Sequence, residues 1–264
     1  MMARDTALAS LNEKGYTLIR GVLSRSQALL LGDLAEQRWQ RRANVNGHFL
    51  HEFDFLNLEP RFRALVDLRP VLAIVTAALG YNIYVYHCHL TVTHRCTGTD
   101  GRLLAAPFEW HQDGGPLIAD LGGPGAPRMS VKAGFLLSDV PTSQYGPTVM
   151  LANSHRGQSR VPAERDREWP GATPITGQAG DCVVFDNRIW HSRSPNLTDR
   201  PRVLASVAYA PRWIRSRDRL TPPDLTGIDP ASALAQLLGH AHDARSCHVP
   251  TADTQSALLH YLMR

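Results

Sequence analysis

The stretch IYVYHCHLTVT, residues 83–93, decides the fold class, because it has the composition of a long β-strand. One parity of this stretch holds Val85, His87, His89, Thr91 and Thr93. Alternate side chains of a strand point to opposite faces, so we expect these residues to share one face of a sheet. Two histidines and two threonines on one face are unusual for a plain core and typical of the polar lining of a ligand cavity.

Shorter segments with strand patterns follow this stretch and are separated by turn signals. We predict strands at 108–111, 130–137, 148–152, 181–185 and 202–209. Short strands that follow a helical first part indicate a β-sandwich or barrel with helices packed outside it.

The segments before and after these strands have helical patterns. We predict a short strand at 16–23, a helix from Ser24 to about 42 that starts with a Ser24–Gln27 capping box, and a loop at 43–60. A second helix begins near Pro70 and ends at Gly80, and the tail is helical again at 231–238 and 255–262. We therefore expect a single domain, 1–264, with a helical N-terminal part (1–80), a β core (81–213) and a C-terminal helical extension (214–264).

The composition excludes several classes of protein. The 264 residues are 43% hydrophobic and 20% charged, which fits a folded core rather than intrinsic disorder. The sequence has no run of about 18 apolar residues and no apolar signal segment near its start, so we expect no membrane partner. The arginines behind the net charge of +4 are scattered, which disfavours a nucleic-acid partner. The four cysteines form no C-x-x-C pair, which fits a cytoplasmic protein.

The sequence HQD at 111–113 is the centre of the functional argument. On a strand or at its end, His111 and Asp113 point the same way and can bind a divalent metal from one side. A second histidine would complete a two-histidine, one-carboxylate triad, which leaves three coordination positions of Fe(II) open. The candidate is His191, which follows the predicted strand at 181–185. Arg202 opens the next strand and offers a guanidinium for a carboxylate. This set predicts a metal together with a dicarboxylate that chelates it.

The chain resembles the phytanoyl-CoA dioxygenase family of Fe(II)/2-oxoglutarate-dependent oxygenases, which includes ectoine hydroxylase and natural-product tailoring hydroxylases. The resemblance runs from about residue 15 to residue 213. The motifs that carry it are, in order, Gly15-Tyr16, His111-Gln112-Asp113, Leu137-Ser138-Asp139, Gly146-Pro147, Asn153-Ser154-His155, Gly180-Asp181, His191-Ser192-Arg193-Ser194-Pro195-Asn196 and Pro201-Arg202. The resemblance implies a mainly β fold with flanking helices, the double-stranded β-helix or cupin-like jelly-roll barrel.

The resemblance also implies roles for particular residues. His111, Asp113 and His191 take the roles of catalytic iron ligands, and Arg202 that of the partner of the distal carboxylate of 2-oxoglutarate. Weaker expectations are cofactor contacts by Thr91, His87 and Phe108, and substrate contacts by His89 and Lys132. Two positions depart from the family pattern: Arg193 stands where a serine often helps to hold the carboxylate, and Ala152-Asn153 replaces a Pro-Gly pair.

The implied cofactors are Fe(II), 2-oxoglutarate and O2, and the implied reaction is hydroxylation of an unactivated C–H bond with release of succinate and CO2. The substrate class is a small molecule, for example an intermediate of secondary metabolism. The carboxylate of Asp113 disfavours halogenation, whereas desaturation, ring formation and epimerisation stay open. Two alternatives to an oxygenase are a non-catalytic cupin-like ligand-binding protein and a hydrolase with zinc at the same triad. The hydrolase alternative leaves Arg202 without a role. The loops at 43–60 and 114–127 are candidate lids, and the sequence leaves substrate identity and oligomeric state open.

Overall fold

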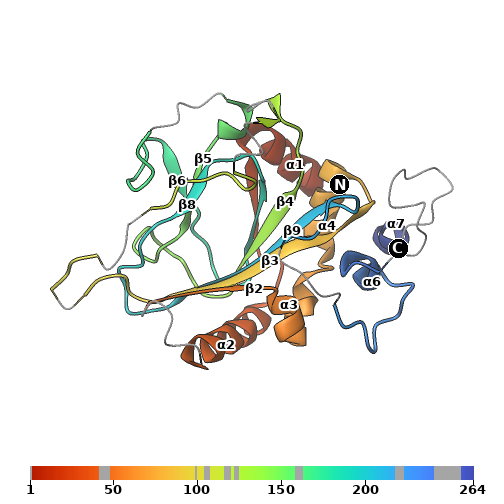
Figure 1. Ribbon diagram of the computed structural model, residues 1–264, viewed down its shortest axis with the longest axis horizontal. Helices are drawn as coiled ribbons and strands as arrows, with labels where there is room; N and C mark the ends of the chain where they lie inside the picture. The colour runs from red at the N-terminus through yellow and green to blue at the C-terminus, as the bar shows by residue number, and fades with distance from the viewer. Residues whose placement is uncertain are drawn as a thin grey trace.

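The computed structural model consists of two antiparallel β-sheets with helices around them (Figure 1). It describes residues 2–41, 48–98, 100–103, 108–115, 120–121, 125–157, 163–217, 223–240 and 257–264. The larger sheet has the strand order β1-β7-β4-β9-β3-β2, and the smaller sheet has the order β6-β5-β8. The strands are β1 (Tyr16–Ile19), β2 (Phe49–Phe53), β3 (Ile83–Thr93), β4 (Val131–Leu136), β5 (Thr148–Leu151), β6 (Ala172–Pro174), β7 (Cys182–Asp186), β8 (His191–Arg193) and β9 (Arg202–Pro211).

The strand predicted at 83–93 is β3, and the structure gives it the predicted bounds. A bulge interrupts its pairing with β9, because Val85 lies opposite Tyr209 whereas His87 lies opposite Ala208, which leaves Tyr86 as the extra residue. The extra residue reverses the alternation. Val85 therefore packs in the hydrophobic core, while Tyr86 lines the cavity together with the histidines of this strand. The prediction that Val85 shares the face of the histidines is wrong.

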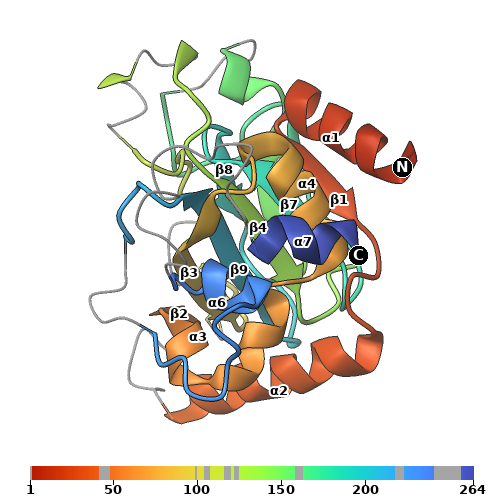
Figure 2. The ribbon, with the colours of Figure 1, turned by 90° about the vertical axis from the view of Figure 1, so that its right-hand side faces the viewer.

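The helices cover the outer face of the larger sheet (Figures 1 and 2). Helices α2, α3 and α6 contact β3, and α4 contacts β4 and β9. Leu34, Val75 and Leu237 from three of these helices pack in one hydrophobic cluster with Leu90 and Val207 of the sheet. The helices are α1 (Met2–Lys14), α2 (Arg25–Arg41), α3 (Phe55–Leu58), α4 (Arg69–Leu79), α6 (Ala233–Leu237) and α7 (Ala257–Met263), with 3-10 turns at Pro60–Leu65 and Ser154–Arg156.

The predicted helix ends agree with the structure. The backbone N–H of Ser24 donates to Oε1 of Gln27 at 3.0 Å, and the N–H of Gln27 donates to Oγ of Ser24 at 3.2 Å, so the capping box is confirmed. Pro70 lies in the first turn of α4, and Gly80 follows its last residue with a φ of +81°. Among the described residues, no helix combines the length and the apolar character that a bilayer span requires.

Two local predictions are wrong. Residues 49–53, expected in a loop, form the edge strand β2, in which Glu52 is only 2% exposed and pairs with Arg38 of α2. Because the charged Glu52 lies on the buried face of β2, the segment lacks the hydrophobic alternation that would have predicted a strand. The strand expected at 108–111 does not form, and only His111 pairs there, in an isolated bridge to His191. Of the candidate lid at 114–127, residues 116–119 and 122–124 lie outside the described part of the chain, as do residues 43–47 of the other loop.

Candidate active site

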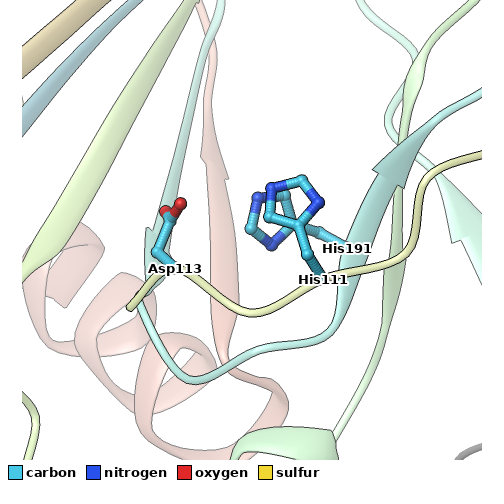
Figure 3. A group of neighbouring side chains, drawn as sticks. All are labelled: His111, Asp113 and His191. Atoms are coloured by element: carbon cyan, nitrogen blue, oxygen red, sulfur yellow. The ribbon is translucent and has the colours of Figure 1, made fainter. Parts of the chain in front are cut away.

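Two histidines face each other across the bridge between residues 111 and 191. The backbone N–H of each donates to the carbonyl oxygen of the other at 3.0 Å, and the ring centroids lie 4.3 Å apart (Figure 3). Nδ1 of His111 lies 2.8 Å from the carbonyl oxygen of Glu109, and Nδ1 of His191 lies 3.0 Å from that of Ile189. Because a carbonyl oxygen only accepts, each Nδ1 carries the proton and each Nε2 keeps its lone pair for a metal.

Asp113 completes a group of three metal-ligand side chains. Its carboxylate points toward the two imidazoles (Figure 3), and one ligand atom from each of the three residues lies within 4.8 Å of the others. Asn187 donates from Nδ2 to the carbonyl oxygen of Asp113 at 3.4 Å, and its Oδ1 accepts the N–H groups of Met129 and Ser130, which ties the turn to the start of β4. Two imidazoles and one carboxylate are the donor set that suits Fe(II) with open positions.

A buried lysine of β4 pairs with this carboxylate. Nζ of Lys132 lies 2.6 Å from Oδ2 of Asp113, and the two side chains are 5% and 6% exposed. Burial alone raises the pKa of Asp113, but the positive charge of Lys132 and the neighbouring histidines hold it well below its usual range. Burial and the nearby His111 lower the pKa of His191 to about 3. The site therefore favours an ionised carboxylate and a neutral imidazole, which are the protonation states that bind a divalent cation.

Arg202, the first residue of β9, is buried in the same cavity. Its Nη1 donates to Oγ1 of Thr91 at 3.2 Å, and its Nη2 donates to Oγ1 of Thr148 at 3.0 Å. Burial and the charge of Arg193 lower the pKa of Arg202 to about 10, so it stays charged at neutral pH. Among the described residues no carboxylate pairs with this guanidinium. A buried cation of this kind is ready to bind the carboxylate of a ligand.

The cavity has a volume of about 780 Å³ and is lined by residues of both sheets. His87 and His89 line it, as predicted for their face of β3, and Lys132 lines it too. Nε2 of His87 lies 3.1 Å from Nδ1 of His89. His51 of β2 lies beside them, with its ring centroid 4.8 Å from that of His89. Sequence reasoning missed His51, because its segment was expected to be a loop.

Phe108 lies elsewhere than expected. It packs with Trp110 and Trp169 in a separate aromatic cluster and is not among the residues that line the cavity. The centroids of Trp110 and Trp169 are 4.2 Å apart and their rings are nearly parallel. Glu109 and His111 line the cavity. Phe108 is three residues from His111, an odd separation that turns the two side chains to opposite sides of an extended chain.

Arg193, which replaces a serine of the family pattern, lines the cavity and makes contacts of its own there. Its guanidinium stacks on the ring of Phe49 at 3.8 Å and pairs with Glu109 at 3.3 Å. The hydroxyl contacts of Arg202 come instead from Thr91, which the sequence predicts as a cofactor contact, and from Thr148, which sequence reasoning missed. The signal for Thr148 is its place directly after the Gly146-Pro147 motif, at the start of β5.

Ser154 and His155 hold two neighbouring segments of the site in place. Oγ of Ser154 accepts the N–H of Trp190 at 2.9 Å, which holds the residue before His191. Gly15 has a φ of +89°, and a Cβ there would lie 2.7 Å from Nδ1 of His155. A side chain at position 15 is therefore excluded by both the backbone conformation and the close approach.

The fold and the donor set together are those of the jelly-roll oxygenases that use Fe(II) and 2-oxoglutarate. The model of the phytanoyl-CoA dioxygenase (PhyH) family matches residues 11–204, and the chain belongs to this family. As a member, the protein is a 2-oxoglutarate-dependent non-haem iron oxidoreductase that uses O2, which confirms the predicted family, enzyme class and cofactors.

Individual relatives agree with this assignment. The chain is 26% identical to L-proline trans-4-hydroxylase of Streptomyces griseoviridis over 210 residues, which cover 69% of this chain and 73% of that protein. It is 24% identical to ectoine dioxygenase of Nocardia farcinica over 206 residues, which cover 63% and 66%. The structure of HygX from Streptomyces hygroscopicus with nickel and 2-oxoglutarate bound superimposes with a TM-score of 0.61 at 18% identity, and the match covers 80% of this chain and 88% of that one. This likeness confirms the predicted fold.

Proposed function

We propose that the protein hydroxylates an unactivated C–H bond of a small-molecule substrate, with His111, Asp113 and His191 as the iron ligands. The observation that carries the proposal is the cluster of their ligand atoms within 4.8 Å of one another, in the cavity that also holds Arg202. The similarity to a proline hydroxylase and to an ectoine dioxygenase supports hydroxylation as the outcome.

The residues of this chain position the reactants. Bound iron, with 2-oxoglutarate and O2, supplies the oxidation of a C–H bond with release of succinate and CO2. His111, Asp113 and His191 would hold the metal, which a triad of this kind leaves able to bind 2-oxoglutarate and O2. Arg202, oriented by the hydroxyls of Thr91 and Thr148, binds the distal carboxylate of 2-oxoglutarate.

Contacts between the two sheets form one wall of the cavity, in which His111 is exposed and His191 is buried. Arg193 of β8 stacks on Phe49 of β2 and pairs with Glu109, so it joins both sheets across the cavity wall. The ring of Phe185 lies edge-on to His191, with centroids 4.9 Å apart.

The test uses metal-free protein under anaerobic conditions, to which Fe(II) and then 2-oxoglutarate are added. We expect the weak visible charge-transfer band of the chelate in the wild type, and its loss in His111→Ala and in Arg202→Ala. His260→Ala, which removes an exposed histidine of α7, is the matched control and retains the band. Failure of the wild type to bind iron refutes the triad, and iron binding without the band in the wild type refutes chelation of 2-oxoglutarate at this site. A band that persists in Arg202→Ala refutes the role of Arg202. In air with a substrate, a product that gains one oxygen atom distinguishes hydroxylation from desaturation and epimerisation.

A further inference from the structure

A second group of polar residues lines the cavity besides the metal ligands and Arg202. It consists of His51, His89, Arg215 and Arg217, which we call the basic wall. The arginines belong to the segment that follows β9, and this segment is fastened to the bulge of β3. The carbonyl oxygen of Tyr86 accepts both the N–H of Arg217 at 2.9 Å and Oγ of Ser216 at 3.0 Å. The bulge therefore places the arginines beside the cavity.

Acidic groups are scarce in this cavity. Of the described residues, only Asp113 and Glu109 line it with carboxylates. Each of them already faces a cation, because Asp113 pairs with Lys132 at 2.6 Å and Glu109 pairs with Arg193 at 3.3 Å. These pairs leave no carboxylate of the cavity for the basic wall.

The metal and 2-oxoglutarate do not remove the positive excess. The two positive charges of Fe(II) cancel the two negative charges of 2-oxoglutarate, and the two ion pairs of the cavity are neutral. The cavity therefore keeps a positive net charge. Arg202 faces a carboxylate of 2-oxoglutarate, whereas Arg215 and Arg217 have no carboxylate partner among the described residues. A cavity with this field attracts and orients an anion.

The histidines of the basic wall are suited to donate hydrogen bonds without adding charge. Burial, followed by the positive charges of His87, Lys132, Arg193 and Arg217, lowers the pKa of His51 to about 4. Each neutral imidazole keeps one N–H donor. Beside them the ring of Phe53 lies 4.6 Å from that of His51, so an apolar surface adjoins the polar donors.

We infer that the basic wall binds an anionic group of the substrate, a carboxylate or a phosphate ester, while an apolar part of the substrate packs against Phe53 and Tyr86. The inference rests on the proposed function and specifies the substrate class of the same site. Arg215 and Arg217 supply the charge, and His51 and His89 supply neutral donors. The substrate is therefore an organic anion with an apolar or aromatic body.

The test uses nickel-loaded protein saturated with 2-oxoglutarate, so that Arg202 is already occupied when the probe is added. Calorimetry compares 3-phenylpropanoate and phenyl phosphate with the neutral 3-phenylpropanamide. We expect the better anion to bind at least about tenfold more tightly than the amide, as charge-assisted hydrogen bonds imply. The tighter of the two anions identifies a carboxylate or a phosphate as the recognised group.

Variants assign the effect to the basic wall. We expect Arg217→Gln and Arg215→Gln to weaken binding of the anion several-fold and to leave binding of the amide unchanged. Arg156→Gln removes the same charge from an exposed residue outside the cavity and leaves both affinities unchanged. The affinity of each variant for 2-oxoglutarate, equal to that of the wild type, verifies that it is folded.

The outcomes separate this inference from the proposed function. A wild type that does not bind 2-oxoglutarate refutes the proposed function. A wild type that binds 2-oxoglutarate but binds the anions no better than the amide refutes the inference alone. A loss in Arg156→Gln as large as that in Arg217→Gln also overturns it, because the effect then comes from net charge rather than from the basic wall.

Discussion

Removing the charge of Lys132 tests whether this lysine neutralises the negative charge of the Asp113 carboxylate in the metal-free protein. In Lys132→Met the 6% exposed carboxylate loses the ammonium that lies 2.6 Å away, while an apolar stem of similar volume remains. Breaking a buried ion pair by removing one partner costs about 3–5 kcal/mol. Because each kcal/mol shifts the Tm of a protein near this size by about 2–4 °C, we expect the metal-free variant to unfold on the order of 10 °C below the wild type.

A divalent metal replaces the missing counter-charge of Asp113. We therefore expect saturating Ni(II) to raise the Tm of Lys132→Met by more than that of the wild type in scanning calorimetry. Lys14→Met is the matched control, since Lys14 is the only other lysine of the chain and is exposed at the end of α1, and its Tm stays at the wild-type value. Equal Tm values of Lys132→Met and wild type without metal, or equal shifts on adding metal, refute this reasoning.

Three further predictions follow from the contacts of the cavity. Arg202→Lys keeps the charge but loses the guanidinium fork, so we expect the Kd of 2-oxoglutarate to rise about tenfold or more in calorimetry; an unchanged Kd excludes Arg202 as the anchor. Thr148→Val removes one hydroxyl that orients Arg202, and we expect a smaller rise of the same Kd; a rise as large as that of Arg202→Lys contradicts an orienting role. The pKa of His51 is lowered from 6.5 to about 4, so between these pH values the unfolded chain binds a proton that the folded chain does not. The stability of the metal-free wild type therefore falls as the pH falls through this window, and urea titrations should show a smaller fall for His51→Gln; equal falls would exclude His51 as a source of the pH dependence.

Strands β3, β4, β5, β7 and β9 were predictable because each carries its own pattern of β-branched and aromatic residues, whereas β6 and β8, of three residues each, were missed. The bulge at Tyr86 was not predictable, because it depends on the pairing of β3 with β9 and on the segment fastened to the Tyr86 carbonyl, neither of which residues 83–93 contain. Strand β2 was missed for a different reason. Its Glu52 is buried because it pairs with Arg38 of α2. The burial of Glu52 therefore depends on a helix outside β2 and could not be predicted from the residues of the strand alone.

The candidate metal ligands were predicted, although part of the argument for them does not hold. His111 and Asp113 were placed on one face by strand alternation, yet residues 108–110 form no strand. What positions His111 is its bridge to His191, a contact between segments eighty residues apart in the chain. Thr148 shows the same limit, because its contact with Arg202 depends on how the smaller sheet lies over the larger one.

Lys132 explains how the buried carboxylate of Asp113 stays ionised, the form that a metal requires. Burial favours the protonated form of Asp113, which binds a divalent cation poorly, and Lys132 opposes this effect more strongly than the neighbouring histidines do. The ammonium of Lys132 offsets it, and the ion pair engages Oδ2 of the carboxylate. The position that interrupts the apolar pattern of β4 therefore has a role at the metal site, and the same charge is felt by the histidines of the basic wall. One lysine thus connects the metal ligands to the part of the cavity that we assign to the substrate anion.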